Sequence, residues 1–144
     1  MKTFLLAFTL TAATLQVAAS PLSASKAGSM QTALDDLSLA LANHGYHLVK
    51  VQPIDQALVK RGFSDPGIRI AFVGREEQVR QALEADPALL NLLPMRLTLE
   101  NDHGQVRISS DDLAQWRESR PSAGKVLQQW EDELAAILSD YAGP

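Results

Sequence analysis

The alternation of apolar and polar positions is clearest in "NLLPMRLTLENDHGQVRIS", residues 91–109, where it predicts a β-hairpin. Every second residue is apolar on both sides of a segment rich in turn-forming residues, 101–104. The apolar positions are Met95, Leu97, Leu99, Val106 and Ile108, and the polar positions between them include Arg96, Thr98, Glu100, Arg107 and Ser109. Since side chains alternate across a strand, one face of this hairpin should be buried and the other exposed.

Two further stretches have the composition of strands. Residues 46–52 are rich in β-branched and aromatic side chains, and Pro53 follows them. In the second stretch, residues 68–74, apolar side chains occupy one side and Arg69 the other. The apolar side is formed by Ile68, Ile70 and Phe72. We expect that side to face the core and Arg69 to lie on the polar side of the sheet.

Apolar residues at helical spacing predict three longer helices. The first runs from Ser29, a suitable N-cap, to Gly45, which can end it in a left-handed turn. The second covers residues 75–87, and the third begins at Ser122. The apolar stripe of the second helix, expected to be buried, consists of Val79, Ala82 and Leu83. Shorter helical segments are expected at residues 54–61, at 87–93 and around 113–116.

The order of these elements is mixed, and the one clear hairpin is antiparallel. A sheet with one apolar face needs helices on that face only, which predicts an α+β fold. We expect a two-layer sandwich, with a mostly antiparallel sheet of about four strands and helices on one face. Residues 20–28 are small and polar and are expected to form a flexible leader, which leaves 29–144 as a single domain.

The first 19 residues have the pattern of a secretory signal peptide. Lys2 precedes the apolar run "FLLAFTLTAATLQVA", and Val17-Ala18-Ala19 supplies the small residues that a signal peptidase requires. Threonines interrupt this run, which is shorter than the roughly 20 apolar residues of a membrane span. We therefore predict cleavage near Ala19 and a periplasmic or secreted protein whose mature chain has no membrane span.

The composition excludes several classes of function. The chain has no cysteine, so disulfides, thiolate nucleophiles, iron–sulfur clusters and covalently attached haem are excluded. Its formal net charge of −4 does not suit nucleic-acid binding, which requires a clustered basic surface. We expect no cofactor, and an exported chain without cysteine is more typical of a bacterial periplasm than of a eukaryotic secretory route.

Several short motifs between Leu34 and Ser110 resemble the domain-of-unknown-function 302 family of small bacterial and archaeal proteins. The matching residues are Gly45-Tyr46, Ile54-Asp55-Gln56-Ala57, Gly62, Phe72 with Gly74, Pro87, and Leu93-Pro94-Met95-Arg96-Leu97. The resemblance implies a few antiparallel strands backed by helices, often paired as a dimer, with no established activity. Many members have histidine where this chain has Gln56, and Asn-Pro where it has Arg75-Glu76.

Candidate catalytic residues are few. Asp55 lies in the first turn of a short helix, where its carboxylate can cap free backbone amides or act as an acid or base. The capping role is the simpler interpretation. The three histidines, His44, His47 and His103, lack the spacing of a metal motif, and we expect no metal site. His47, at the start of a strand, remains a second candidate.

The polar side of the sheet is the remaining candidate site. Arg69, Arg96 and Arg107 are expected on this side and can converge with Thr98 and Ser109. Such a surface is either solvated, a dimer contact, or a site for an anionic small molecule. We therefore expect an exported binding or interaction module, with a homodimer, a small molecule or a periplasmic protein as partner. The alternative is a small hydrolase-like enzyme that uses Asp55 or a histidine.

Overall fold

The structure is a computed structural model that describes residues 21–64 and 67–144. The predicted signal peptide, residues 1–19, lies outside the described residues. The elements are β1 (Ser23–Ala27), α1 (Met30–Asn43), β2 (His47–Gln52), α2 (Ile54–Val59), β3 (Ile68–Gly74), α3 (Glu76–Ala85), the 3-10 helix η1 (Pro87–Leu92), β4 (Met95–Asp102), β5 (Gln105–Ser110), α4 (Ala114–Ser119), the 3-10 helix η2 (Pro121–Ala123) and α5 (Gly124–Ala142).

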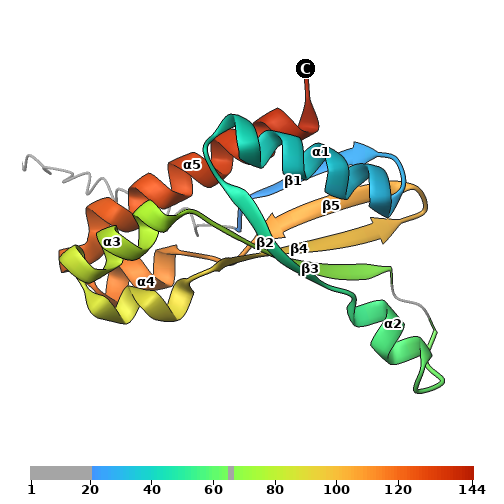
Figure 1. The fold of residues 1–144 in the computed structure, drawn as a ribbon, viewed down its shortest axis with the longest axis horizontal. Helices are drawn as coiled ribbons and strands as arrows, with labels where there is room; N and C mark the ends of the chain where they lie inside the picture. The colour runs from blue at the N-terminus through green and yellow to red at the C-terminus, as the bar shows by residue number, and fades with distance from the viewer. Residues whose placement is uncertain (1–20, 65–66) are drawn as a thin grey trace, which may run out of the picture.

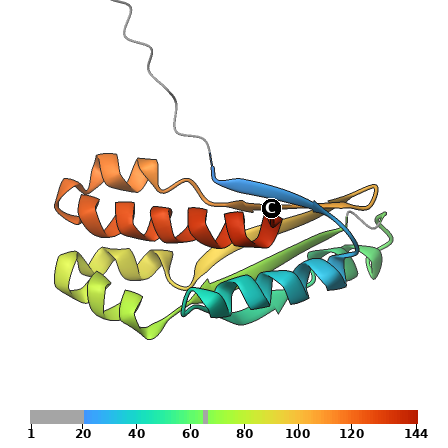
Figure 2. The same ribbon diagram turned by 90° about the horizontal axis from the view of Figure 1, so that it is seen from above.

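The strands form one antiparallel sheet in the order β1-β5-β4-β3-β2. Helices α1 and α5 lie side by side over one face of this sheet, whereas α3, α4 and η1 extend past the ends of the strands (Figures 1 and 2). The arrangement confirms the predicted α+β fold. The sheet has five strands rather than about four, because the N-terminal segment contributes one.

Strand β1 corrects the expectation that residues 20–28 form a flexible leader. It pairs with β5 from Ser23 opposite Ser109 to Ala27 opposite Gln105, and the backbone N–H of Ser110 donates to the carbonyl of Leu22 at 2.9 Å. Small polar side chains give little sign of a strand. An edge strand depends chiefly on its backbone hydrogen bonds, which the alternation of side chains does not reveal. The folded domain therefore begins before residue 29.

The core lies between the sheet and the two covering helices. The hairpin prediction is confirmed, because the alternating apolar residues of β4 and β5 are all buried. The fully buried large side chains include Leu37, Leu41, Leu97, Leu99, Ile108, Leu127, Trp130 and Ile137. Ser29 caps α1 as predicted, since its hydroxyl accepts a 3.1 Å bond from the Thr32 N–H, and Gly45 follows with a φ of 72°.

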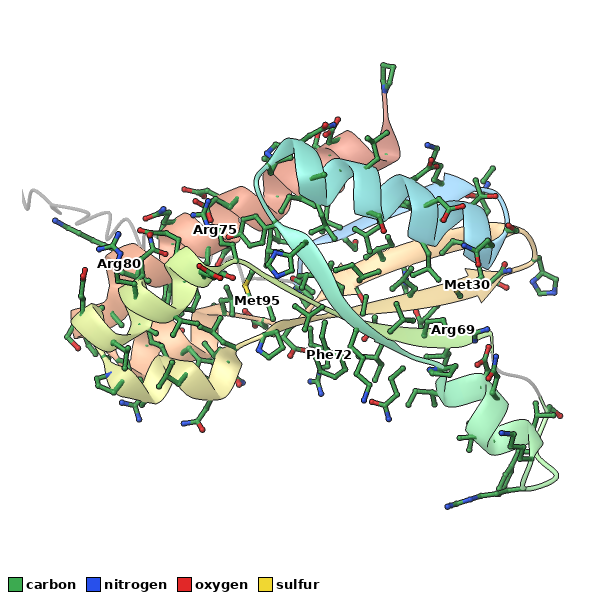
Figure 3. All side chains as sticks on the ribbon, viewed as in Figure 1. Met30, Arg69, Phe72, Arg75, Arg80 and Met95 are labelled. Atoms are coloured by element: carbon green, nitrogen blue, oxygen red, sulfur yellow. The ribbon has the colours of Figure 1, made fainter. Side chains whose placement is uncertain are left out.

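The faces of β3 are the reverse of the prediction. Ala71 and Val73 are buried against the helices, so Arg69 shares the covered side with them. Ile68, Ile70 and Phe72 consequently lie on the uncovered side, and Phe72 points away from α1 and α5 (Figure 3). The register with β4 establishes which side Ile68, Ile70 and Phe72 are on, because each of them is paired with a residue on the uncovered side of β4.

The apolar stripe of α3 is likewise not buried as expected. Ala82 is buried, but Val79 and Leu83 are 45% and 54% exposed. The helix turns Gln78 and Gln81 inward instead: Gln78 is buried, and Oε1 of Gln81 accepts a 2.8 Å bond from Nε1 of Trp130 on α5. These amide contacts fix the rotation of α3 and leave its larger apolar side chains in solvent.

Candidate functional site: the open face of the sheet

The side of the sheet away from α1 and α5 is called here the open face. Its members on the three central strands alternate with buried residues and are paired with one another across the strands. They are Ile68, Ile70 and Phe72 on β3, Arg96, Thr98 and Glu100 on β4, and Arg107 and Ser109 on β5. Four of the five residues predicted for the polar surface therefore do share one face: Arg96, Arg107, Thr98 and Ser109.

The two arginines of the open face are each bound to a carboxylate. Arg96 donates to Oδ1 of Asp111 at 3.0 Å, and Arg107 donates to Oε2 of Glu100 at 2.6 Å. The hydrogen bond and charge of Glu100 raise the pKa of Arg107 further above its usual range. Both guanidinium groups therefore already have an anionic partner. Lys50 of β2, opposite Phe72, also lies on this side and has no ion pair among the described residues, so the face offers one free lysine and no convergent free arginines for an anion.

Arg69, predicted for the same surface, lies on the other side of the sheet. Its guanidinium forms an ion pair with the carboxylate of Asp55, and both side chains are largely buried. The Asp55 carboxylate also accepts a 2.7 Å bond from the Gln56 N–H, in agreement with the predicted capping role. The ion pair joins the start of α2 to β3. The buried carboxylate of Asp55 therefore has a structural role.

The centre of the open face is apolar. Ile68, Ile70 and Phe72 form a row along β3, flanked by polar residues of β4 on one side and β2 on the other. All three are partly exposed, because no helix of residues 21–64 or 67–144 lies over this side of the sheet. An apolar centre with a charged rim has the composition of a protein interface rather than of a site for ions.

A groove of about 340 Å³ lies at one end of the sheet, between the start of β2 and the segment α3–η1. The candidate His47 lies in its wall and is exposed. The apolar lining residues are Val49, Val79, Leu90, Leu93 and Pro94. The groove was not predicted from the sequence, because Val79 was expected to be buried in the core. The apolar residues on this otherwise charged helix could have indicated a binding surface.

A polar cluster on the covered side involves Tyr46, a residue of the family motifs, and Arg75, which stands where many family members have asparagine. The Tyr46 hydroxyl donates to Glu133 of α5, Nη2 of Arg75 donates to the same carboxylate at 2.6 Å, and the guanidinium lies 4.8 Å from the centre of the Tyr46 ring. Burial and the Glu133 hydrogen bond raise the pKa of Tyr46 far above its usual range. Partial burial alone would raise the pKa of Glu133, but the bonds from Tyr46 and Gln129 and the charge of Arg75 outweigh it and lower that pKa.

The three histidines are dispersed. His44 follows the last turn of α1, and its Nε2 lies 3.5 Å from Oδ2 of Asp140 on α5. His103 is in the hairpin turn beside Asp102, and His47 is on β2. Within residues 21–64 and 67–144, no group of three or more histidine or acidic side chains is placed to hold a metal ion. In the same ranges, no helix combines the length and the apolar character needed to cross a membrane.

The fold and its open face define a two-layer α+β domain, and comparison with known proteins gives its family. The family model described as domain of unknown function DUF302 matches residues 23–141, so the chain belongs to this family, as the motifs indicated. A solved structure with a similar fold is the crystal structure of an uncharacterized conserved DUF302 protein from Bacillus stearothermophilus. It is 16% identical, with 83% of this chain and 96% of that chain covered and a TM-score of 0.76. No curated protein matches.

Proposed function

We propose that this protein is an exported interaction module that associates with a second copy of itself through the open face. The observation that supports this proposal is the uncovered apolar row of Ile68, Ile70 and Phe72. A second open face packed against the first would bury both rows. Such a contact is isologous, which is the commonest symmetry of protein dimers.

The rim of the open face is consistent with a protein partner. Arg96 and Arg107 are neutralised by Asp111 and Glu100 at the margin of the apolar row, so the free cation that each copy brings from its described central face is Lys50, opposite Phe72. An anionic small molecule would have to displace one of these carboxylates. We therefore favour association over the anion site.

Enzymatic activity has less support than association. The hydrolase-like alternative would use Asp55 or a histidine, but the Asp55 carboxylate is buried and bound by Arg69. A general acid or base must lie within hydrogen-bonding distance of the proton that it transfers. A buried carboxylate that is paired with Arg69 is not accessible to a substrate.

The test measures mass in solution by light scattering on a size-exclusion column. Ile70→Lys, in the middle of the apolar row, should convert a dimer into a monomer. Leu39→Lys is the matched control, because Leu39 is an exposed leucine on α1, in the opposite layer. A wild type that stays monomeric at its highest soluble concentration would contradict association, as would equal loss of the dimer in both variants.

Export is a separate part of the proposal and has its own test. Mass spectrometry of the protein from its native host should find an N-terminus near Ser20, because Val17-Ala18-Ala19 fits the peptidase rule. An intact Met1 on cytoplasmic protein would contradict export and leave the open-face proposal unaffected.

A further inference from the structure

We propose that the groove between β2 and α3–η1 binds a small, neutral, mainly apolar molecule that carries one hydrogen-bond-accepting oxygen. Apart from Gly74 and His47, which continue the open side of the sheet beyond Phe72, this site uses residues other than those of the open face. The proposal therefore does not rest on self-association, and the two can fail separately.

The walls of the groove are apolar side chains that the fold leaves in solvent. Val49 on β2 is 53% exposed, Val79 on α3 is 45% exposed, and Leu90 on η1 is 39% exposed. Three of the seven large apolar side chains that are exposed among the described residues thus line this one groove. Contiguous exposed apolar surface is typical of a binding site, whereas single exposed residues are ordinary.

A buried amide supplies the polar part of the site. Gln78 lines the groove and is only 1% exposed, and its Oε1 accepts from the Arg75 backbone N–H at 3.3 Å. The one hydrogen bond that its Nε2 makes within the described residues is to the Met95 sulfur, at 3.4 Å. Since a thioether is a weak acceptor and the amide has two hydrogens, Nε2 retains donor capacity for a ligand oxygen.

The charges around the groove favour an uncharged ligand. The guanidinium of Arg75 is held by Glu133 and stacked on Tyr46, so it is not a free cation for a carboxylate or phosphate. Glu76 lies at the rim and repels anions. A molecule with a carbonyl or ether oxygen and no charge meets both conditions.

The groove volume of about 340 Å³ also limits the size of the ligand. Pockets for small molecules span about 300 to 1,000 Å³, and this one is near the lower end. It suits a compact aromatic or branched aliphatic ketone, ester or amide better than a long acyl chain. An extended peptide would leave most of its length outside the groove.

The direct test is a fluorescence titration with prodan, a neutral dye that has one carbonyl oxygen. We expect saturable binding of one prodan per chain, and weaker binding of the anionic dye anilinonaphthalene sulfonate. The double variant Val49→Thr/Val79→Thr replaces two wall methyl groups by hydroxyls without a change in shape. It should weaken prodan binding about tenfold or more.

The matched control is Val59→Thr, which makes the same change on α2. Val59 is 48% exposed, as similar to Val79 as the chain offers, and it does not line the groove. Its prodan affinity should equal that of the wild type. Equal weakening in Val59→Thr, or the absence of saturable binding, would overturn the proposal.

Gln78→Leu tests the hydrogen bond to the dye, and circular dichroism must first show that the variant is folded, because the change also removes the acceptor of the Arg75 N–H. Prodan emission shifts to shorter wavelength when its carbonyl loses a hydrogen bond, so dye bound to this variant should emit to the blue of dye bound to the wild type. An identical emission maximum in a folded variant would overturn the role of the amide.

Two further outcomes would assign the groove differently. Tighter binding of the anionic dye than of prodan would overturn the neutral ligand class. A dimer that dissociates in Val49→Thr/Val79→Thr would show that the groove is a subunit contact, and the ligand proposal would fall. Ile70→Lys, by contrast, should leave prodan binding unchanged even if it abolishes the dimer.

Discussion

Helices α5 and α3 are both amphipathic in sequence, yet the fold uses their apolar stripes in opposite ways. The stripe of α5 is buried against the sheet and α1, with Leu127, Trp130 and Leu134 almost fully enclosed. The stripe of α3 faces solvent through Val79 and Leu83, while amide side chains make its inward contacts. An apolar stripe therefore identifies a surface that gains from being covered, but it does not show whether the same chain covers it.

The largest expected difference between the two helices is in stability. Leu127→Ala on α5 should lower the free energy of unfolding by about 4 kcal/mol, because it leaves a cavity in the core. Leu83→Ala on α3 removes the same atoms from a half-exposed site and should cost less than about 0.5 kcal/mol. Urea denaturation measures both, and similar losses would mean that α3 is also covered by its own chain.

Breaking the Asp55–Arg69 ion pair should have the next largest effect. Asp55→Asn leaves Arg69 buried without its counter-ion and should cost about 3 kcal/mol by thermal or urea unfolding. The double variant Asp55→Asn/Arg69→Met removes the stranded charge and should recover part of that loss. A single variant as stable as the wild type would mean that solvent reaches the pair.

The Glu133 cluster predicts a pH dependence. The pKa of Glu133 is lowered from its ordinary value of 4.5, so its contribution to stability is present above that value. The contribution is lost as the pH falls through the lower, folded-state pKa. Glu133→Gln should therefore be less stable than the wild type at pH 7, and the gap should narrow towards pH 3. A constant gap in urea midpoints would contradict this assignment.

The smallest effect is expected at the rim of the open face. Arg96→Gln with Arg107→Gln should leave the unfolding midpoint almost unchanged, because exposed ion pairs contribute little. The double variant should raise the dissociation constant of the proposed dimer by less than Ile70→Lys does, since rim charges mainly affect association rates. Sedimentation velocity separates these cases, and a larger effect than that of Ile70→Lys would make the charges the main contact.

The strands and helices that could be predicted are those whose alternation has only one interpretation. In β4 and β5, every second residue is apolar and the residues between are polar, so the buried face was unambiguous. In β3 both sides have apolar residues, and Arg69 suggested that its side was exposed. The partner that allows Arg69 to be buried, Asp55, comes from α2, and no local pattern shows that pairing.

Prediction of the candidate sites had the same limits: local alternation could be read from the sequence, but long-range contacts could not. The alternation of side chains in β4 and β5 could be predicted, and the register places Arg96, Thr98, Arg107 and Ser109 on one face. The apolar row of the open face and the groove could not be predicted, because both depend on how β3 and α3 are rotated. That rotation is set by long-range contacts, such as the bond between Trp130 and Gln81.

The pairing of β1 with β5 has a consequence for the order in which the domain can be completed. Strand β1 is synthesised first but has no pairing partner until β5, Gln105–Ser110, has been synthesised. Helix α5, which packs on β1, is synthesised after β5. Such long-range closure is slow, and the waiting segment "SASKA" is small and polar, so it offers little for aggregation. The sheet of such a chain is completed only after its C-terminal part has been made, which is compatible with the export proposed above.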